Sequence, residues 1–432
     1  RLVPKRPDDR AILALAVPAL GALAADPLYS LVDTAFVGHL GTAELGALAV
    51  GSAAFTASFW IFSFLAYGVT PKVAAAFGRG DAGEAASIGV QAALIAVASG
   101  LVVTLLGVLG AGPIVRLLGA EGEVATIAEP YLRIRVLSST AVLLGQVGHG
   151  WLRGAQDTRT PMLIAVAGAV FNIVLDYVFI YIAGWGVSGA AWATVVAQGG
   201  AAVAFIWVLR PHTAAVPMRL DLPVARSLLS VGRGLVVRTG ALLAAMTLAT
   251  ALAARMGTLA LGSWQIAMQL FLFLALVLDS IAIAAQALIG RALGADARGT
   301  RALAGRLMWW GSATGVILGA VVLLARQPVA TLFSNDPEVV DAAVGLLTWV
   351  ALVQPLSAVA FTLDGILIGA LQTDFLAKAM LLASGVYGAG AAAAYLGGAG
   401  TAGLALAATA WLGVRVVTTG LRFRSDAWLT PL

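Results

Sequence analysis

The sequence predicts an all-α integral membrane protein with twelve transmembrane helices in two pseudo-symmetric six-helix bundles. Three observations lead to this fold class: the composition, the number of long apolar runs, and a repeat between the two halves of the chain. Of the 432 residues, 60% are hydrophobic and only 11% are charged, and the mean hydropathy is +0.96. About a quarter of the residues of a soluble domain are charged, so this composition indicates a surface that mostly faces lipid.

Twelve apolar runs are long enough to cross a bilayer, whose hydrocarbon core of about 30 Å requires roughly 20 helical residues. Several runs exceed this length, which indicates tilt or extension beyond the bilayer. Prolines inside some of the runs predict bends, because proline removes a backbone hydrogen bond. The predicted spans are residues 11–37, 44–77, 84–108, 124–150, 160–183, 188–210, 223–255, 259–290, 300–325, 338–370, 374–396 and 401–422.

The basic residues gather in alternate loops and at both chain ends, whereas loops such as GHLGTAE, AGWGVSG and GGAGT contain no lysine or arginine. The positive-inside rule therefore predicts a multi-pass protein of the cell membrane with both termini in the cytoplasm. The charged head RLVPKRPDDR runs directly into the first span, so no cleavable signal peptide is expected. Because the sequence does not begin with Met, a few residues are expected to precede it. The basic residues on the predicted cytoplasmic side are Arg1, Lys5, Arg6, Arg10, Arg79, Arg153, Arg159, Arg210, Arg219, Arg226, Arg291, Arg298, Arg301, Arg306, Arg422 and Arg424.

The chain repeats itself at an offset of 215 residues. LLGAEGEVATIA at 117–128 resembles LFSNDPEVVDAA at 332–343, and GAQDT at 154–158 matches GALQT at 369–373. A shift of six spans keeps the orientation in the membrane, so the two halves, residues 1–215 and 216–432, are predicted to be parallel repeats. Such pairs of bundles are an architecture of secondary transporters, whose sites lie near the middle of the membrane.

Ionisable residues inside a span are costly and therefore point to function. Asn172 and Asp176 are four residues apart in FNIVLDYVFI and share a helix face, as do Tyr29 and Asp33 in the first span. If these faces meet, two carboxylates share a dry pocket that can exchange a proton or hold a monovalent cation. The alternative is that each acid only hydrogen-bonds a bent helix, and this structural reading is favoured for Asp26, which directly precedes a proline.

The C-terminal half has polar residues of its own. Asp279 and Gln286 are seven residues apart and lie on one helix face, and Asp364 belongs to LDGILIGALQT. Arg238 is predicted either to neutralise one of these acids, since charges in the membrane usually pair, or to act in the site. His149 precedes Asp364 by 215 residues and is its counterpart in the repeat. A structural role is expected for this histidine, and its near-neutral titration leaves a proton role open.

The sequence does not point to an enzyme, a cofactor, a metal or a nucleic-acid partner. It has no phosphate-binding loop of the G-x-x-x-x-G-K-[ST] type and no H-E-x-x-H. It has no cysteine, and His39, His149 and His212 are too scattered for a metal site. The sequence pI of about 9.8 comes from short loops between apolar runs. Without a nucleotide site, transport must draw on an ion gradient or on the gradient of the substrate itself.

PLYSLVDTAFVGHLGTAELGALAVG, residues 27–51, resembles the first signature of the multidrug and toxic compound extrusion (MATE) transporters. GHGWLRGAQDTRTPM and FNIVLDYVFI follow in the expected places, and GRALGADAR and LDGILIGALQT follow in the second half. With IAAQALIGRALG, the chain is similar to the DinF-like branch, which also resembles plant organellar members. The resemblance covers essentially the whole chain and implies the MATE or MOP flippase fold of two six-helix bundles.

This resemblance implies export of organic cations or amphipathic drugs in exchange for protons, or possibly sodium ions, by alternating access. The family's first-helix acid matches Asp33, and its fifth-helix N-x-x-x-D matches Asn172 and Asp176. The tyrosine one turn before the first acid matches Tyr29, and a sixth-helix threonine of the same network matches Thr194. These five residues are the expected coupling site.

The resemblance also implies roles outside that network. The family's tenth-helix acid matches Asp364, and Pro18 matches a first-helix proline whose bending accompanies protonation in some accounts. His149 falls near a fourth-helix polar position where some relatives have asparagine. Some branches bind sodium through a seventh-helix glutamate, whereas this chain has Arg238 nearby and no glutamate, which favours protons.

Two other functions would leave different signs in the sequence. A flippase for a lipid-linked precursor, from the same superfamily, would show a strongly cationic central cavity, and only Arg238 stands out at mid-membrane. A passive channel would need pore-lining polar residues in most spans. The sequence leaves open the natural substrate, the oligomeric state, and whether drug and proton share one site.

Overall fold

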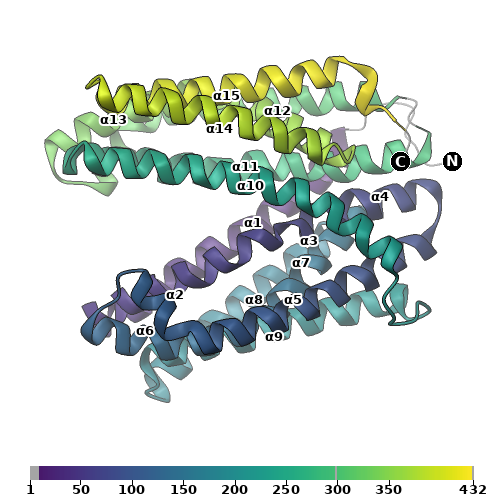
Figure 1. Ribbon diagram of the computed structural model, residues 1–432, viewed down its shortest axis with the longest axis horizontal. Helices are drawn as coiled ribbons and strands as arrows, with labels where there is room; N and C mark the ends of the chain where they lie inside the picture. The colour runs from purple at the N-terminus through teal and green to yellow at the C-terminus, as the bar shows by residue number, and fades with distance from the viewer. Residues whose placement is uncertain (1–8, 297–298, 431–432) are drawn as a thin grey trace. The chain divides into compact units, whose positions relative to one another are not determined.

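The computed structural model describes residues 9–296 and 299–430 and is helical throughout its regular structure (Figure 1). The basic residues Arg1, Lys5, Arg6 and Arg298 lie outside the described residues. The α-helices are α1 (Asp9–Gly38), α2 (Thr42–Phe59), α3 (Phe64–Tyr67), α4 (Val69–Arg79), α5 (Ala82–Leu117), α6 (Gly122–Arg135), α7 (Ser139–Gly154), α8 (Arg159–Tyr177), α9 (Gly186–Thr213), α10 (Leu222–Arg255), α11 (Thr258–Ala295), α12 (Thr300–Phe333), α13 (Pro337–Gly369), α14 (Thr373–Leu396) and α15 (Gly400–Arg424).

Within the described residues, eleven helical stretches are long and apolar enough to cross a membrane. Ten of the twelve predicted spans correspond to one such stretch each. The predicted span 44–77 is divided by a 3-10 turn, Trp60–Ser63, and only its second part, Ile61–Arg79, is among the eleven. The predicted span 124–150 is divided at Val136–Ser138 into α6 and α7. The all-helical membrane fold is confirmed.

The division between α6 and α7 has a local cause. The Ser138 hydroxyl donates to the carbonyl oxygen of Arg135 at 2.8 Å, and the Ser139 hydroxyl donates to that of Val136 at 2.5 Å. Serine hydroxyls that bond to backbone three residues earlier compete with the helical ladder. Two consecutive serines at this point therefore favour the tighter turn, which a count of apolar residues does not reveal.

The helices form two compact units. The N-terminal unit is Val17–Gly232, and the C-terminal unit is Arg233–Leu432 together with the beginning of α1 up to Ala16. Helices α1 and α10 therefore each begin in one unit and continue in the other. The division into residues 1–215 and 216–432, which follows the repeat, stays a prediction.

The beginning of α1 is anchored in the C-terminal unit. The Asp9 carboxylate accepts from the Arg306 Nε and from its terminal amino group, at 2.5 Å each, and from the Trp310 Nε1 at 2.9 Å. Two turns later, Leu15 and Ala16 pack in a buried apolar cluster with α11. An ion pair and a hydrophobic contact thus both tie these turns of α1 to that unit.

The beginning of α10 is anchored in the N-terminal unit in the corresponding way. The Lys72 Nζ donates to the Ser227 hydroxyl at 2.5 Å, and the Gln91 side chain accepts from the backbone N–H of Asp221 at 3.0 Å. Leu228 is buried there at 2% exposure. The exchange of helix starts is reciprocal, and it follows the repeat of the sequence.

Glycines allow equivalent helices of the two units to cross at close range. A Cβ added to Gly150 on α7 would lie 2.8 Å from the carbonyl oxygen of Ala66, and one added to Gly365 on α13 would lie 2.6 Å from that of Ala282. Real side chains do not approach backbone this closely, so only glycine permits these crossings. The glycines one turn later repeat the contact: Gly154 at Thr70 and Gly369 at Gln286.

Candidate functional site

A cavity of about 260 Å³ lies inside the N-terminal unit. Its wall is built from one side of α1, from α3, α7, α8 and α9, and from the turn before α3. Alanines and glycines make up much of the wall, and polar side chains interrupt it. Among these polar residues are Asp26, Tyr29, His149, Arg153, Asn172 and Thr194.

Helix α8 holds Asn172 and Asp176 on one face, and both are buried, at 2% and 0% exposure. In the amide orientation that satisfies both ends of Asn172, its Nδ2 donates to the Asp176 Oδ2 at 3.1 Å. Its Oδ1 accepts from the backbone N–H of Thr194 on α9 at 3.2 Å. The Thr194 hydroxyl donates to its own helix, at the carbonyl oxygen of Ala190, 3.0 Å away. The structure therefore brings these three predicted residues together.

The backbone changes geometry directly after Asp176. Residues Val178–Ile182 form a π-helical turn, and Tyr181 within it donates to the carbonyl oxygen of Phe36 on α1 at 2.7 Å. A π-helical turn is rare and often occurs next to functional residues. Here it fixes the end of α8 against α1, the helix that carries Asp33.

Asp33 is also buried, at 8% exposure, and its charge lies within electrostatic range of Asp176. Among the described residues, the Oδ1 atoms of both carboxyl groups lack a hydrogen-bond partner. Two carboxylates that repel each other and have too few hydrogen-bond donors can relieve this repulsion by binding a proton or a monovalent cation. Tyr29 lies one turn before Asp33 and reaches the cavity wall.

The three acids of this region differ in their access to the cavity. Asp26 forms part of the wall, as Asn172 and Thr194 do, whereas Asp33 and Asp176 do not belong to it. The Asp33–Asp176 pair is thus not part of the wall, and Asn172, which binds Asp176, is the link between this pair and the cavity.

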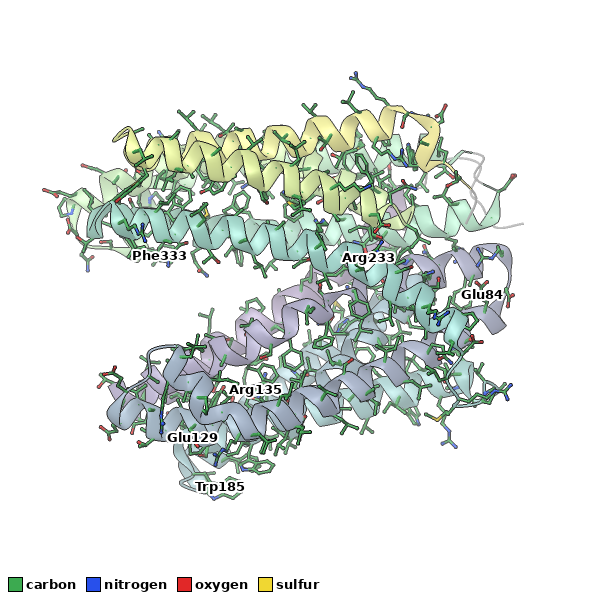
Figure 2. All side chains as sticks on the ribbon, viewed as in Figure 1. Glu84, Glu129, Arg135, Trp185, Arg233 and Phe333 are labelled. Carbon is green, nitrogen blue, oxygen red and sulfur yellow. The ribbon has the colours of Figure 1, made fainter. Side chains whose placement is uncertain are left out.

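One charged residue of this unit was missed by the sequence reasoning: Arg135 at the end of α6 (Figure 2). It is 8% exposed, its guanidinium carbon lies 3.8 Å from the centroid of the Phe55 ring, and its NH1 donates to the Ser138 hydroxyl at 2.6 Å. Its charge lies within electrostatic range of Asp26 and Asp33. The signal was present, because Arg135 is an ionisable residue inside the predicted span 124–150.

The C-terminal unit contains a buried charge cluster. Asp364 on α13 accepts from Arg238 on α10 at 2.5 Å and from Arg415 on α15 at 2.6 Å. The pairing of Arg238 with an acid is one of the two predicted readings, whereas Arg415 was not predicted. Arg415 is 3% exposed and lies 4.5 Å from the centroid of the Trp411 ring. Its signal was an arginine inside the last predicted span.

The other predicted residues lie on α1, α7 and α11. Gln286 and Asp279 are both on α11, where Gln286 is 2% exposed and packs at the crossing with Gly369, and Asp279 is half-buried. His149 lines the cavity with its ring centroid 4.9 Å from that of Phe205. Pro18 lies inside α1, which continues as one helix to its end.

No group of three or more histidines, aspartates or glutamates in the described parts of the chain is placed to hold a metal ion. A repeated helical bundle in the membrane, with a polar cavity beside buried carboxylates, defines the class of secondary transporters. The chain belongs to the MatE family, whose family model matches residues 18–178 and 241–396. It is therefore a transporter and not an enzyme.

Relatives and solved structures agree with this assignment. The chain is 35% identical over 386 residues to the Arabidopsis thaliana Protein DETOXIFICATION 44, chloroplastic, covering 86% of this chain and 74% of the relative. It is 30% identical to the DNA damage-inducible protein F of Escherichia coli (strain K12), covering 87% and 84%. The Probable multidrug resistance protein NorM of Thermotoga maritima is 26% identical, covering 83% and 79%. The resemblance to MATE transporters and to DinF is confirmed, and the chain is a multi-pass efflux transporter.

The fold also matches solved structures. One, described as a crystal structure of MATE in the bent conformation, superposes with a TM-score of 0.87 at 20% identity, covering 96% of this chain and 95% of that one. Another, described as the outward-facing conformation of a multidrug resistance MATE family transporter of the MOP superfamily, gives 0.86, covering 96% and 94%. At this identity the likeness shows the fold alone.

Proposed function

We propose that the chain exports organic cations or amphipathic drugs in exchange for protons by alternating access, and that Asp33 and Asp176 carry the proton. The observation that supports this most directly is the buried carboxylate pair, whose Oδ1 atoms lack partners among the described residues. Asn172, in the wall of the cavity, holds Asp176 and links it to α9. The pair is therefore positioned to pass a change of charge to the cavity.

In the proposed cycle, the N-terminal cavity binds a cationic compound while the pair is ionised. Protons from the outer side then neutralise the pair, α1 changes its conformation in response, and the compound leaves. Return to the inward-facing state delivers the protons to the cytoplasm. Pro18 and Tyr29 are proposed to couple α1 to this change, since they lie on the same helix as Asp33.

Two features favour protons over sodium as the coupling ion, and favour the N-terminal unit as the place of coupling. Asp364 already has two arginine partners, and an acid held by two guanidinium groups does not need a further cation. Sodium requires several oxygen ligands, whereas the position where some branches have a glutamate lies near Arg238. We therefore propose that the C-terminal cluster stabilises its unit and that coupling occurs elsewhere.

We also propose that both termini lie in the cytoplasm and that the protein works in the cell membrane. The support is the distribution of arginine among the loops. Membrane-impermeant thiol labelling of Gly80→Cys and Gly398→Cys in spheroplasts tests this orientation. We expect labelling from outside at Gly398→Cys alone, and labelling at Gly80→Cys would reverse the orientation.

The test of coupling is efflux of a fluorescent organic cation from proteoliposomes, driven separately by a pH gradient and by a sodium gradient. We expect the pH gradient to drive transport in the wild type and in Glu123→Gln, an exposed acid of the same unit. Asp33→Asn and Asp176→Asn should reduce transport to the level of empty liposomes. Folding of each variant is checked by its elution and thermal unfolding in detergent.

Other results would change the proposal in specific ways. Transport driven by sodium would replace the ion. Full activity in both acid variants would remove them from the coupling step. If no organic cation were transported, the flippase for a lipid-linked precursor would become the better reading.

A further inference from the structure

We propose that Asp26 binds the positive charge of the transported compound, on a carboxylate separate from the Asp33–Asp176 pair that exchanges the proton. This inference rests on the proposed function and adds to it a residue that recognises the substrate. The transported compound and the proton then bind to different acids within one unit of the protein.

The position of Asp26 carries the proposal. It lies in the wall of the cavity, and its side chain is exposed, whereas Asp33 and Asp176 lie outside the wall and are buried. Among the described residues, the Asp26 carboxylate has no hydrogen-bond or ion-pair partner. The structural role expected from its place before Pro27 is therefore not seen, and the carboxylate is available to a ligand.

The surroundings of Asp26 favour an organic cation. The rings of Tyr29, Tyr67 and Phe205 belong to the same wall, between stretches of alanine and glycine. Aromatic faces attract an ammonium or pyridinium group, and small residues leave room for a flat apolar body. A carboxylate beside such rings provides both the charge and the apolar contacts that a protonated amine or quaternary nitrogen requires.

The other charged and titratable groups limit the ligand to a single positive charge. Arg135 lies within electrostatic range of Asp26, and Arg153 and His149 stand in the wall. The two arginines oppose a second cation in the cavity. A volume of about 260 Å³ is near the lower limit for ligand pockets, which is about 300 Å³, so we infer a compact monovalent aromatic cation.

A matched pair of fluorescent probes tests the role of Asp26. One is the cation dimethylaminostyryl-methylpyridinium. The other lacks the methyl group on the pyridine nitrogen and is uncharged at mildly alkaline pH. Binding to detergent-purified protein is followed by fluorescence anisotropy. We expect Asp26→Asn to bind the cation about tenfold more weakly and the neutral analogue as the wild type does. Asp26→Glu should restore part of the loss, and Glu123→Gln should change neither. Unchanged cation binding in Asp26→Asn would overturn the proposal.

Because the sequence has no cysteine, a second test is possible in which both samples come from the same folded preparation. Asp26→Cys is divided into two portions of one preparation. One is labelled with a sulfonatoethyl methanethiosulfonate reagent, which adds a negative charge, and the other with the trimethylammonium-ethyl reagent, which adds a positive one. We expect cation binding to recover only in the first portion. Equal binding in both portions would contradict a role for the charge of Asp26.

The proposed function and this inference fail separately. Asp33→Asn and Asp176→Asn should keep most of their affinity for the cationic probe while losing transport driven by the pH gradient. If transport persists in them, proton coupling through the pair is wrong whatever Asp26 does. If they lose probe binding as completely as Asp26→Asn does, the separation of the two acids is wrong.

Discussion

The Asn172 amide joins α8 to α9 through the backbone N–H of Thr194, because the threonine hydroxyl is engaged with its own helix. We therefore expect substitutions at these two residues of the coupling network to lower the transport rate by different amounts. Asn172→Ala removes the donor to Asp176 and should lower the transport rate about tenfold, while Thr194→Val should stay within about twofold. Initial rates in proteoliposomes measure both. A larger loss in Thr194→Val would show that the hydroxyl is the essential contact.

Buried charge also determines the behaviour of single residues in the C-terminal unit. Removing one partner of a buried ion pair leaves an uncompensated charge, so Arg415→Met should destabilise the protein by about 3 kcal/mol. Arg233 forms an exposed pair with Asp374, 3.3 Å apart, and is the matched control. Arg233→Met should cost less than about 1 kcal/mol. Thermal unfolding in detergent compares them, and equal costs would contradict the structural role of the cluster.

At the scale of helices, the close crossings depend on the glycines that face a neighbouring backbone. Gly365→Ala would place its Cβ against the carbonyl oxygen of Ala282, so we expect a loss of about 1–3 kcal/mol in stability. Gly385 on α14 has no atom within 4 Å of an added Cβ. Gly385→Ala should therefore be neutral or stabilise by up to about 1 kcal/mol. Thermal unfolding of the two variants distinguishes a packing effect from a general effect of helix propensity.

The sequence could locate the helices because a span in lipid must be long, apolar and nearly free of charge. It could not locate the breaks within two spans, since these depend on local hydrogen bonds such as those of Ser138 and Ser139. For the site, spacing along one helix predicted that Asn172 and Asp176 share a face. Which residues of distant helices meet, and that Asp26 alone of the three acids lines the cavity, depends on packing that no spacing records.

At the scale of the whole molecule, the repeat predicted two similar halves but not that the beginnings of their first helices are exchanged. The ion pair of Asp9 with Arg306 holds the beginning of α1 in the C-terminal unit. Arg306→Gln should therefore speed amide hydrogen exchange in residues 9–16 roughly three- to fivefold. Arg301 lies on the same helix as Arg306 and pairs with Asp426, so Arg301→Gln is the control. Equal protection of residues 9–16 in all three proteins would mean that apolar packing alone holds them.

This exchange of helix starts has a consequence for biosynthesis. Asp9 meets a partner that follows it by 297 residues in the chain. A ribosome that adds 5–20 residues per second needs about 15–60 s to make that distance. During this time the first turns of α1 are in the membrane or at its surface without their native neighbours, while most of the N-terminal unit is already complete. The N-terminal end of the chain is thus among the last parts to reach its final place.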